Sequence, residues 1–194
     1  MMPANGPAND RRRLLEGVVY LVLFGLTIPA ANWLIGHAGT ECVPNGGPCL
    51  IPVAPGLMAP SGVTMIGIAL VLRDLVQRRL GVGIAVVAIN VGAALSAVIA
   101  PPMLVIASTV AFLMSELADL AVYTPLARRR LVAAVVASSM VGLVVDSIVF
   151  LYLAFGSLDF LLGQIVGKAW MVLASIPFVA WLRRRDERLG LAPA

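Results

Sequence analysis

Six apolar segments, each about as long as a lipid bilayer is thick, follow one another along this chain. They cover roughly residues 14–36, 60–77, 81–100, 102–126, 131–155 and 159–182. A helix crosses the hydrocarbon core with about 20 mostly apolar residues, and it satisfies its own backbone hydrogen bonds there. Because 60% of the residues are hydrophobic and only 12% are charged, the composition is not that of a soluble domain. The sequence predicts an all-α membrane protein, a bundle of six transmembrane helices within residues 14–185.

The arginines indicate the orientation of this bundle. They gather before the first segment, at the end of the second, after the fourth and after the sixth, so thirteen of the fourteen Lys and Arg residues fall on one side. Short loops rich in Lys and Arg stay in the cytoplasm. We therefore expect both termini to be cytoplasmic, and we interpret the net charge of +4 as a topology signal rather than as a sign of nucleic-acid binding.

The two ends of the chain, residues 1–13 and 186–194, are expected to be cytoplasmic tails. The first is rich in Asn, Pro and Ala, a composition typical of disorder. A cleaved signal peptide is the alternative for the first segment. Its apolar stretch continues to Ile35, however, which is longer than a usual signal core, and keeping it leaves an even number of helices.

Both cysteines, Cys42 and Cys49, fall in the long outer loop 37–59. The oxidising exterior permits a disulfide between them, and two free thiols are the alternative. No metal site is expected, because His37 is the only histidine and no CxxC pair occurs.

Small residues recur every four positions in the third segment, at Ala88, Gly92 and Ser96. This spacing lets helix backbones approach closely. It indicates either packing within the bundle or the contact surface of a homodimer.

Four ionisable residues lie inside apolar segments: Glu116, Asp119, Asp146 and Lys168. A charge in hydrocarbon costs about 3 kcal/mol or more, so such residues usually face a partner, a cavity or a substrate. Asp146 and Lys168 are both about 15 Å from the outer ends of their helices at about 1.5 Å per residue. Equal depth predicts an ion pair, which either fixes helix packing or takes part in ligand binding.

The fourth segment carries a polar stripe. Phe112, Glu116, Asp119 and Tyr123 follow one another at three- and four-residue spacings, so they share one helix face. No basic residue lies near the two carboxylates in this part of the sequence. They are therefore candidates for ligand binding or proton coupling, with the aromatic rings as stacking surfaces.

Further polar and aromatic candidates surround these groups. Gln164 lies one turn before Lys168, and Asn32 and Asn90 either hydrogen-bond a neighbouring helix or face a cavity. Trp170, near the middle of its helix, is another stacking candidate.

Arg73 and Asp74 stand together near the end of the second segment, close to the expected cytoplasmic surface. They form either a solvated, snorkelling pair or part of an inner gate.

Catalytic motifs do not occur in this chain. It contains no GK[ST] phosphate loop, no HExxH and no GxSxG, and no histidine lies at membrane depth. We expect neither an enzyme nor a bound cofactor, and the chain alone cannot be an ATP-driven pump.

Several stretches carry a resemblance to a known family. They are AFLMSELADLAVYTPLARRR (111–130), SSMVGLVVDSIVFLYLAFG (138–156), GKAWMVLASIPFVAWLRRR (167–185), AANWLIG with Asn32, and RDLVQRRLG with Asp74 and Arg78. Over residues 18–185 the chain resembles the putative vitamin uptake transporter family, whose studied members are queuosine precursor transporters.

The resemblance implies a six-helix protein of the bacterial inner membrane that takes up 7-cyano-7-deazaguanine or 7-aminomethyl-7-deazaguanine. Such a base offers N1–H and an amine as donors and O6 as an acceptor. Glu116 or Asp146 would accept from the donors. The groups that would donate to O6 are Lys168, Gln164 or Asn90, and the rings that would stack on the base are Phe112, Tyr123 or Trp170.

Two other functions fit the same composition. One is a vitamin-binding membrane subunit that works with a separate ATP-driven module, and the other is a membrane scaffold that transports nothing.

Overall fold

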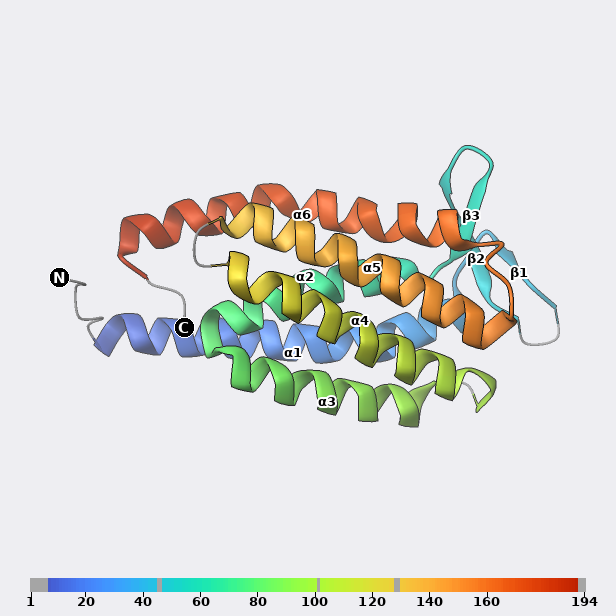
Figure 1. Cartoon of the computed structure of the whole chain (residues 1–194), viewed down its shortest axis with the longest axis horizontal. Coiled ribbons are helices and arrows are strands. Elements are labelled where there is room, and N and C mark those ends of the chain that lie inside the picture. Colours follow the sequence, from blue (N-terminus) through green and yellow to red (C-terminus); the bar gives the residue numbers. More distant parts are fainter. Residues whose placement is uncertain (1–6, 45–46, 101, 128–129, 192–194) are drawn as a thin grey trace.

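Six helices lie side by side in the computed structural model, which describes residues 7–44, 47–100, 102–127 and 130–191 (Figure 1). The helices are α1 (Pro7–His37), α2 (Val63–Leu80), α3 (Val82–Ile99), α4 (Val105–Leu126), α5 (Leu131–Phe155) and α6 (Leu161–Leu189), with a short 3-10 turn, η1 (Pro102–Leu104), before α4. The all-α bundle predicted from the sequence is confirmed.

Five of these helices are long and apolar enough to cross a membrane: α1, α3, α4, α5 and α6. The helix α2 differs, since Arg73, Asp74, Arg78 and Arg79 fall within its 18 residues. It contacts each of the other five helices. Because its charged face is turned toward protein, α2 places ionised groups inside the bundle without exposing them to lipid.

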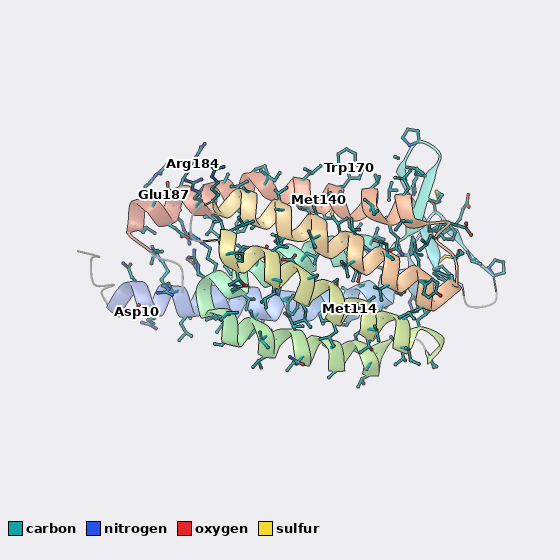
Figure 2. All side chains as sticks on the ribbon, in the orientation of Figure 1. Asp10, Met114, Met140, Trp170, Arg184 and Glu187 are labelled. Atoms are coloured by element: carbon teal, nitrogen blue, oxygen red, sulfur yellow. A yellow bond between two sulfur atoms is a disulfide. The ribbon has the colours of Figure 1, made fainter. Side chains whose placement is uncertain are left out.

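The outer surface of the bundle is apolar along most of its length. Met114, Met140 and Trp170 project outward from α4, α5 and α6 with 49%, 38% and 54% of their surfaces exposed (Figure 2). The labelled charged residues Arg184 and Glu187 lie near one end instead. An apolar belt of this kind suits a lipid environment.

The loop between α1 and α2 folds into a small antiparallel sheet, which the sequence did not predict. It contains β1 (Glu41–Cys42), β2 (Cys49–Ala54) and β3 (Leu57–Pro60), in the order β1-β2-β3. Cys42 pairs with Cys49 across β1 and β2, and a disulfide joins them, the first of the two alternatives. The strands are short and contain prolines, so they carry little strand signal.

Both ends of the helical chain lie at the same end of the bundle, opposite the sheet (Figure 1). The helix α1 begins at Pro7 and α6 continues to Leu189. Residues 7–13 and 186–189, which were expected to lie in the two tails, therefore belong to helices, and Asp186 in the second of these segments pairs with Arg78 and Arg79 of α2. Residues 1–6 and 192–194 lie outside the described residues.

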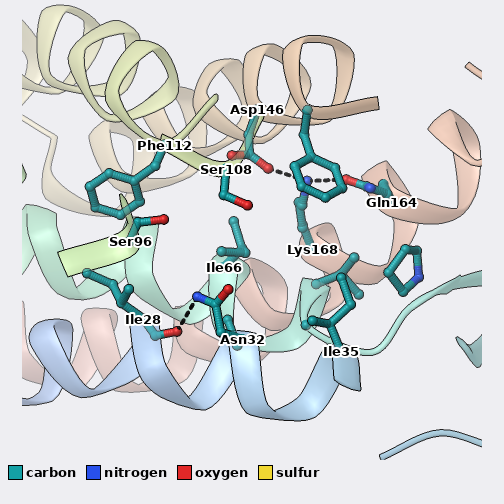
Figure 3. Close-up of a pocket in the computed structure, with 15 residues that line it drawn as sticks. Ile28, Asn32, Ile35, Ile66, Ser96, Ser108, Phe112, Asp146, Gln164 and Lys168 are labelled. Atoms are coloured by element: carbon teal, nitrogen blue, oxygen red, sulfur yellow. Dashed lines mark hydrogen bonds and ion pairs between the residues drawn. The ribbon is translucent and has the colours of Figure 1, made fainter. Parts of the chain in front are cut away.

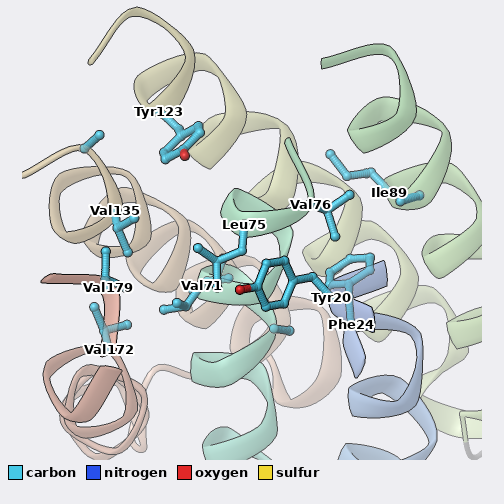
Figure 4. Close-up of a cluster of buried hydrophobic side chains, with 14 of the residues drawn as sticks. Tyr20, Phe24, Val71, Leu75, Val76, Ile89, Tyr123, Val135, Val172 and Val179 are labelled. Atoms are coloured by element: carbon cyan, nitrogen blue, oxygen red, sulfur yellow. The ribbon is translucent and has the colours of Figure 1, made fainter. Parts of the chain in front are cut away.

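The core is formed around α2 by side chains from several helices, among them Tyr20, Phe24, Leu75, Ile89 and Val179 (Figure 4). The small face of α3 also packs inward, since Ala88, Gly92 and Ser96 are buried. A Cβ atom on Gly92 would lie 2.8 Å from the Phe112 ring. The small residues thus serve packing within the bundle.

Candidate functional site

The ion pair predicted between α5 and α6 is present. The Lys168 ammonium donates to Asp146 Oδ2 at 2.6 Å, to Gln164 Oε1 at 2.6 Å and to Ser147 Oγ at 2.8 Å. Lys168 is only 1% exposed. An ammonium has three N–H donors, so all of them are engaged. Ser147, which was not among the candidates from the sequence, follows Asp146 in α5 and accepts the third of these hydrogen bonds.

A pocket opens beside this pair and is lined by residues from all six helices (Figure 3). The space between its walls measures about 600 Å³, including the part that is open to the outside. Its polar groups are Asn32, Ser96, Ser108, Asp146, Gln164 and Lys168. Its apolar walls include Ile28, Ile35, Ile66 and Phe112.

The hydrogen bonds of the pocket determine which polar atoms remain for a ligand. Lys168 donates a hydrogen bond to Gln164 Oε1, so the Nε2 amide group of Gln164 can donate to a ligand. Lys168 likewise uses Asp146 Oδ2, and among the described residues nothing donates to Oδ1. Asn32 donates its Nδ2 to Ile28 O at 2.9 Å, so its Oδ1 is a second available acceptor. The pocket thus combines acceptors and a donor with apolar walls.

Five of the ten predicted ligand-binding residues do not line this pocket: Glu116 and Asp119, which lie in the second polar layer described below, and Asn90, Trp170 and Tyr123. Asn90 is exposed on α3 and donates to Val86 O at 2.8 Å. Trp170 points away from the bundle and donates to Val53 O in β2 at 3.0 Å. Tyr123 is fully buried in the core. The sequence showed their depth, but the direction in which each side chain points follows from how its helix is rotated against its neighbours.

A second polar layer, the Arg73 cluster, consists of Arg73, Asp74, Glu116 and Asp119. The Arg73 guanidinium contacts Asp74 Oδ1 at 2.9 Å, Glu116 Oε2 at 3.1 Å and an oxygen of Asp119. All four side chains are at most 2% exposed. Ser138 on α5 donates to Asp74 Oδ2 at 2.9 Å. One arginine of α2 thereby holds two carboxylates of α4.

This cluster corrects two expectations. Glu116 and Asp119 are not unpaired, since Arg73 binds both; the partner is 43 residues away from Glu116 in the sequence. Arg73 and Asp74 are not a solvated pair either, because both are 0% exposed. The local sequence could not show these contacts, because they form only when α2 packs between the other helices.

A third layer connects the ends of α1, α2 and α6. Asp186 accepts hydrogen bonds from Arg78 and Arg79 at 2.7 to 3.0 Å. Glu16 binds Arg79 at 2.9 Å and Arg185 at 2.6 Å. By sequence alone, Arg78, Arg79 and Arg185 indicate only the topology of the bundle. Two acidic residues beside arginine runs were the available sign that the arginines are paired.

The pocket with its Lys168 pair is the first polar layer, and the Arg73 cluster and the Asp186 contacts are the second and third. They follow one another along α2. Val63 and Ile66 line the pocket, Arg73 follows about 10 Å further along the helix axis, and Arg79 follows after about another 9 Å. The pocket therefore lies nearer the sheet, and two layers of ion pairs lie between it and the arginine-rich end. A pocket that ion pairs close on one side suits the passage of a solute in steps, because ion pairs can break and form again.

Comparison with known proteins identifies the family of this chain. A family model described as putative vitamin uptake transporter matches residues 80–182. The match includes Glu116, Asp119, Asp146, Gln164 and Lys168. Searches of the curated proteins and of the solved structures found no match. Since the matched range is more than half of the chain, this protein belongs to the putative vitamin uptake transporter family.

Proposed function

We propose that this protein takes up a precursor of queuosine, 7-cyano-7-deazaguanine or 7-aminomethyl-7-deazaguanine, across the bacterial inner membrane. The observation that carries the proposal is the pair of free groups beside Lys168. Asp146 Oδ1 is an acceptor and Gln164 Nε2 is a donor, both held in place by the same ammonium. A guanine-type edge presents the complementary groups, N1–H with its amine and O6.

The remaining walls of the pocket suit a flat ring. Phe112 is 5% exposed and lines the pocket with Ile28, Ile66 and Phe150. A bicyclic base buries both faces on apolar and aromatic surfaces of this kind. Lys168 has no donor left for O6, so its role in the proposal is to orient Asp146 and Gln164.

The orientation of the bundle supports uptake. By the positive-inside rule, the arginine-rich end faces the cytoplasm and the sheet faces outward. The pocket then lies on the outer side of the Arg73 cluster, where a solute arriving from outside meets it first.

The test is uptake in a bacterium that neither makes nor imports the precursor. This chain should restore queuosine in tRNA when either deazaguanine is supplied. Asp146→Asn and Gln164→Leu should abolish the restoration, whereas Asn90→Leu, on the outer face of α3, should not. Failure of the wild-type chain with both compounds, despite normal amounts in the membrane, would disprove the proposed substrate.

The same chain should also transport the precursor alone in proteoliposomes that contain no ATP. An absolute requirement for a second protein and ATP would instead indicate a binding subunit of an ATP-driven importer.

A further inference from the structure

The Arg73 cluster contains more acidic groups than its single arginine can neutralise. Asp74, Glu116 and Asp119 surround one guanidinium, and all are at most 2% exposed. Two other cations of the bundle interior have carboxylate partners of their own, Arg78 with Asp186 and Lys168 with Asp146. If all three carboxyl groups were ionised, the cluster would hold two uncompensated negative charges away from water, which is a costly arrangement.

Two of these carboxyl groups are held by the same guanidinium. Asp74 contacts its Nη1 nitrogen and Asp119 its Nη2 nitrogen, so the two carboxyl groups lie beside one another. Asp119 Oδ2 is buried and receives no hydrogen bond from any described residue. Ser138, which donates to Asp74, and Tyr123, whose ring centre lies 5.9 Å from the Arg73 guanidinium carbon, are neutral neighbours. Two carboxyl groups that are held close together away from water do not both ionise readily, and one of them then keeps a proton that the other can accept. A shared proton would therefore supply both the missing hydrogen bond and part of the missing positive charge.

A metal cation fits the cluster less well. Arg73 already contacts an oxygen of each of the three carboxyl groups. No group of His, Cys, Asp and Glu among the described residues is arranged to hold a metal ion. Hard cations need about six oxygen ligands, and a guanidinium beside them would repel the ion.

We propose that the Arg73 cluster is the proton-binding site that couples transport to the proton gradient, a proposal that rests on the transport function above. A proton from the outer solution forms an O–H bond with a carboxyl oxygen of the Asp74–Asp119 pair. That bond breaks when the proton leaves to the cytoplasm, and no bond in the solute changes. The inward flow of protons supplies the free energy for uptake.

The position of the cluster connects this proton to the pocket. Glu116 lies one turn beyond Phe112 on α4, and Phe112 lines the pocket. Arg73 holds α2 against α4 through Glu116 and Asp119. A carboxyl group that gains a proton loses its ionic attraction to Arg73. Protonation thus loosens the contact between two helices that both line the pocket, which is what exchange between outward- and inward-facing states requires.

The direct test is infrared spectroscopy of the purified protein at neutral pH. A protonated carboxyl group has a C=O stretching band that is separate from the carboxylate bands. We expect this band in the wild type, a shift of it in D₂O, and its loss in each of the single variants Asp119→Asn and Asp74→Asn. The exposed Asp159→Asn should leave the band unchanged. Absence of the band in folded wild-type protein would overturn the proposal.

The second test uses proteoliposomes loaded with a pH gradient, acid outside. The gradient should accelerate uptake of the precursor severalfold in the wild type, and a sodium gradient should not. Asp119→Asn should lose this acceleration entirely while still exchanging internal for external precursor. Acceleration by sodium alone would overturn the proton site.

The two proposals fail in different ways. If the infrared band is present and neither deazaguanine is transported, the substrate is wrong while the proton site remains. If uptake occurs without the band and without any effect of pH gradients, the proton site is wrong while the transport function remains.

Discussion

Lys168 Nζ and Asp146 Oδ2 lie 2.6 Å apart between α6 and α5, with Lys168 fully enclosed. The pair forms part of the pocket wall and also joins two helices. The sequence left helix packing and ligand binding as alternative roles for this pair. Its position allows the pair to serve both roles. Variants can separate them.

Lys168→Met should destabilise the protein by about 3 to 5 kcal/mol, because it leaves the Asp146 carboxylate without its cation. The double variant Asp146→Asn with Lys168→Met removes both charges and should recover most of that stability without recovering uptake. Thermal unfolding in detergent and radiolabelled uptake measure the two effects. Equal instability of single and double variants would show that the charge pair is not the cause.

Arg73→Met should prevent accumulation of folded protein, since three buried carboxyl groups would lose their only shared partner. Arg73→Lys keeps the charge but cannot contact three carboxyl groups with separate nitrogens. It should fold with a lowered melting temperature. Arg183→Met is the matched control, because Arg183 forms an exposed pair with Glu187 that contributes about 0.5 kcal/mol. Normal folding of Arg73→Met would contradict the described cluster.

Phe112→Leu should weaken binding of the precursor about fivefold, which corresponds to the roughly 1 kcal/mol of an aromatic contact. Trp170→Leu should leave binding unchanged, since Trp170 lies on the outer surface. Equilibrium binding to purified protein compares them. A larger loss in Trp170→Leu would place the ring-binding surface elsewhere.

Gly67→Ala should destabilise the bundle by about 1 to 3 kcal/mol through overpacking. A Cβ atom there would lie 2.6 Å from the Lys168 carbonyl oxygen and 2.8 Å from Met171 Cβ. Gly25→Ala, also within a helix, meets nothing within 4 Å and should have no such cost. Melting temperatures of the two variants test the close approach of α2 and α6, and equal values would contradict it.

Cys49→Ser leaves Cys42 as the only thiol, on the exposed strand β1. A membrane-impermeant maleimide should label it in intact cells. Cys42→Ser leaves Cys49, which is 2% exposed, and should label far more slowly. The variant Arg184→Cys, in a chain lacking both native cysteines, should react only after permeabilisation. The reverse pattern would invert the topology.

Some residues of the pocket could be predicted from the sequence, and others could not. The Lys168 and Asp146 pair could be predicted because both residues have the same depth, and depth can be counted along a helix at a fixed rise. Asn90 and Trp170 have suitable depth as well, yet their helices turn them outward. Depth is a property of one helix, whereas facing depends on how helices rotate against each other.

The sequence by itself determined the membrane class, the helix count and the matching depth of Lys168 and Asp146, because apolar length and residue rise are local quantities. Tertiary structure alone decided the partners of Glu116, Asp119 and Asp186. The arginines within 3.1 Å of them are on α2, which packs between the other helices. A buried charge takes whichever opposite charge that packing brings within reach.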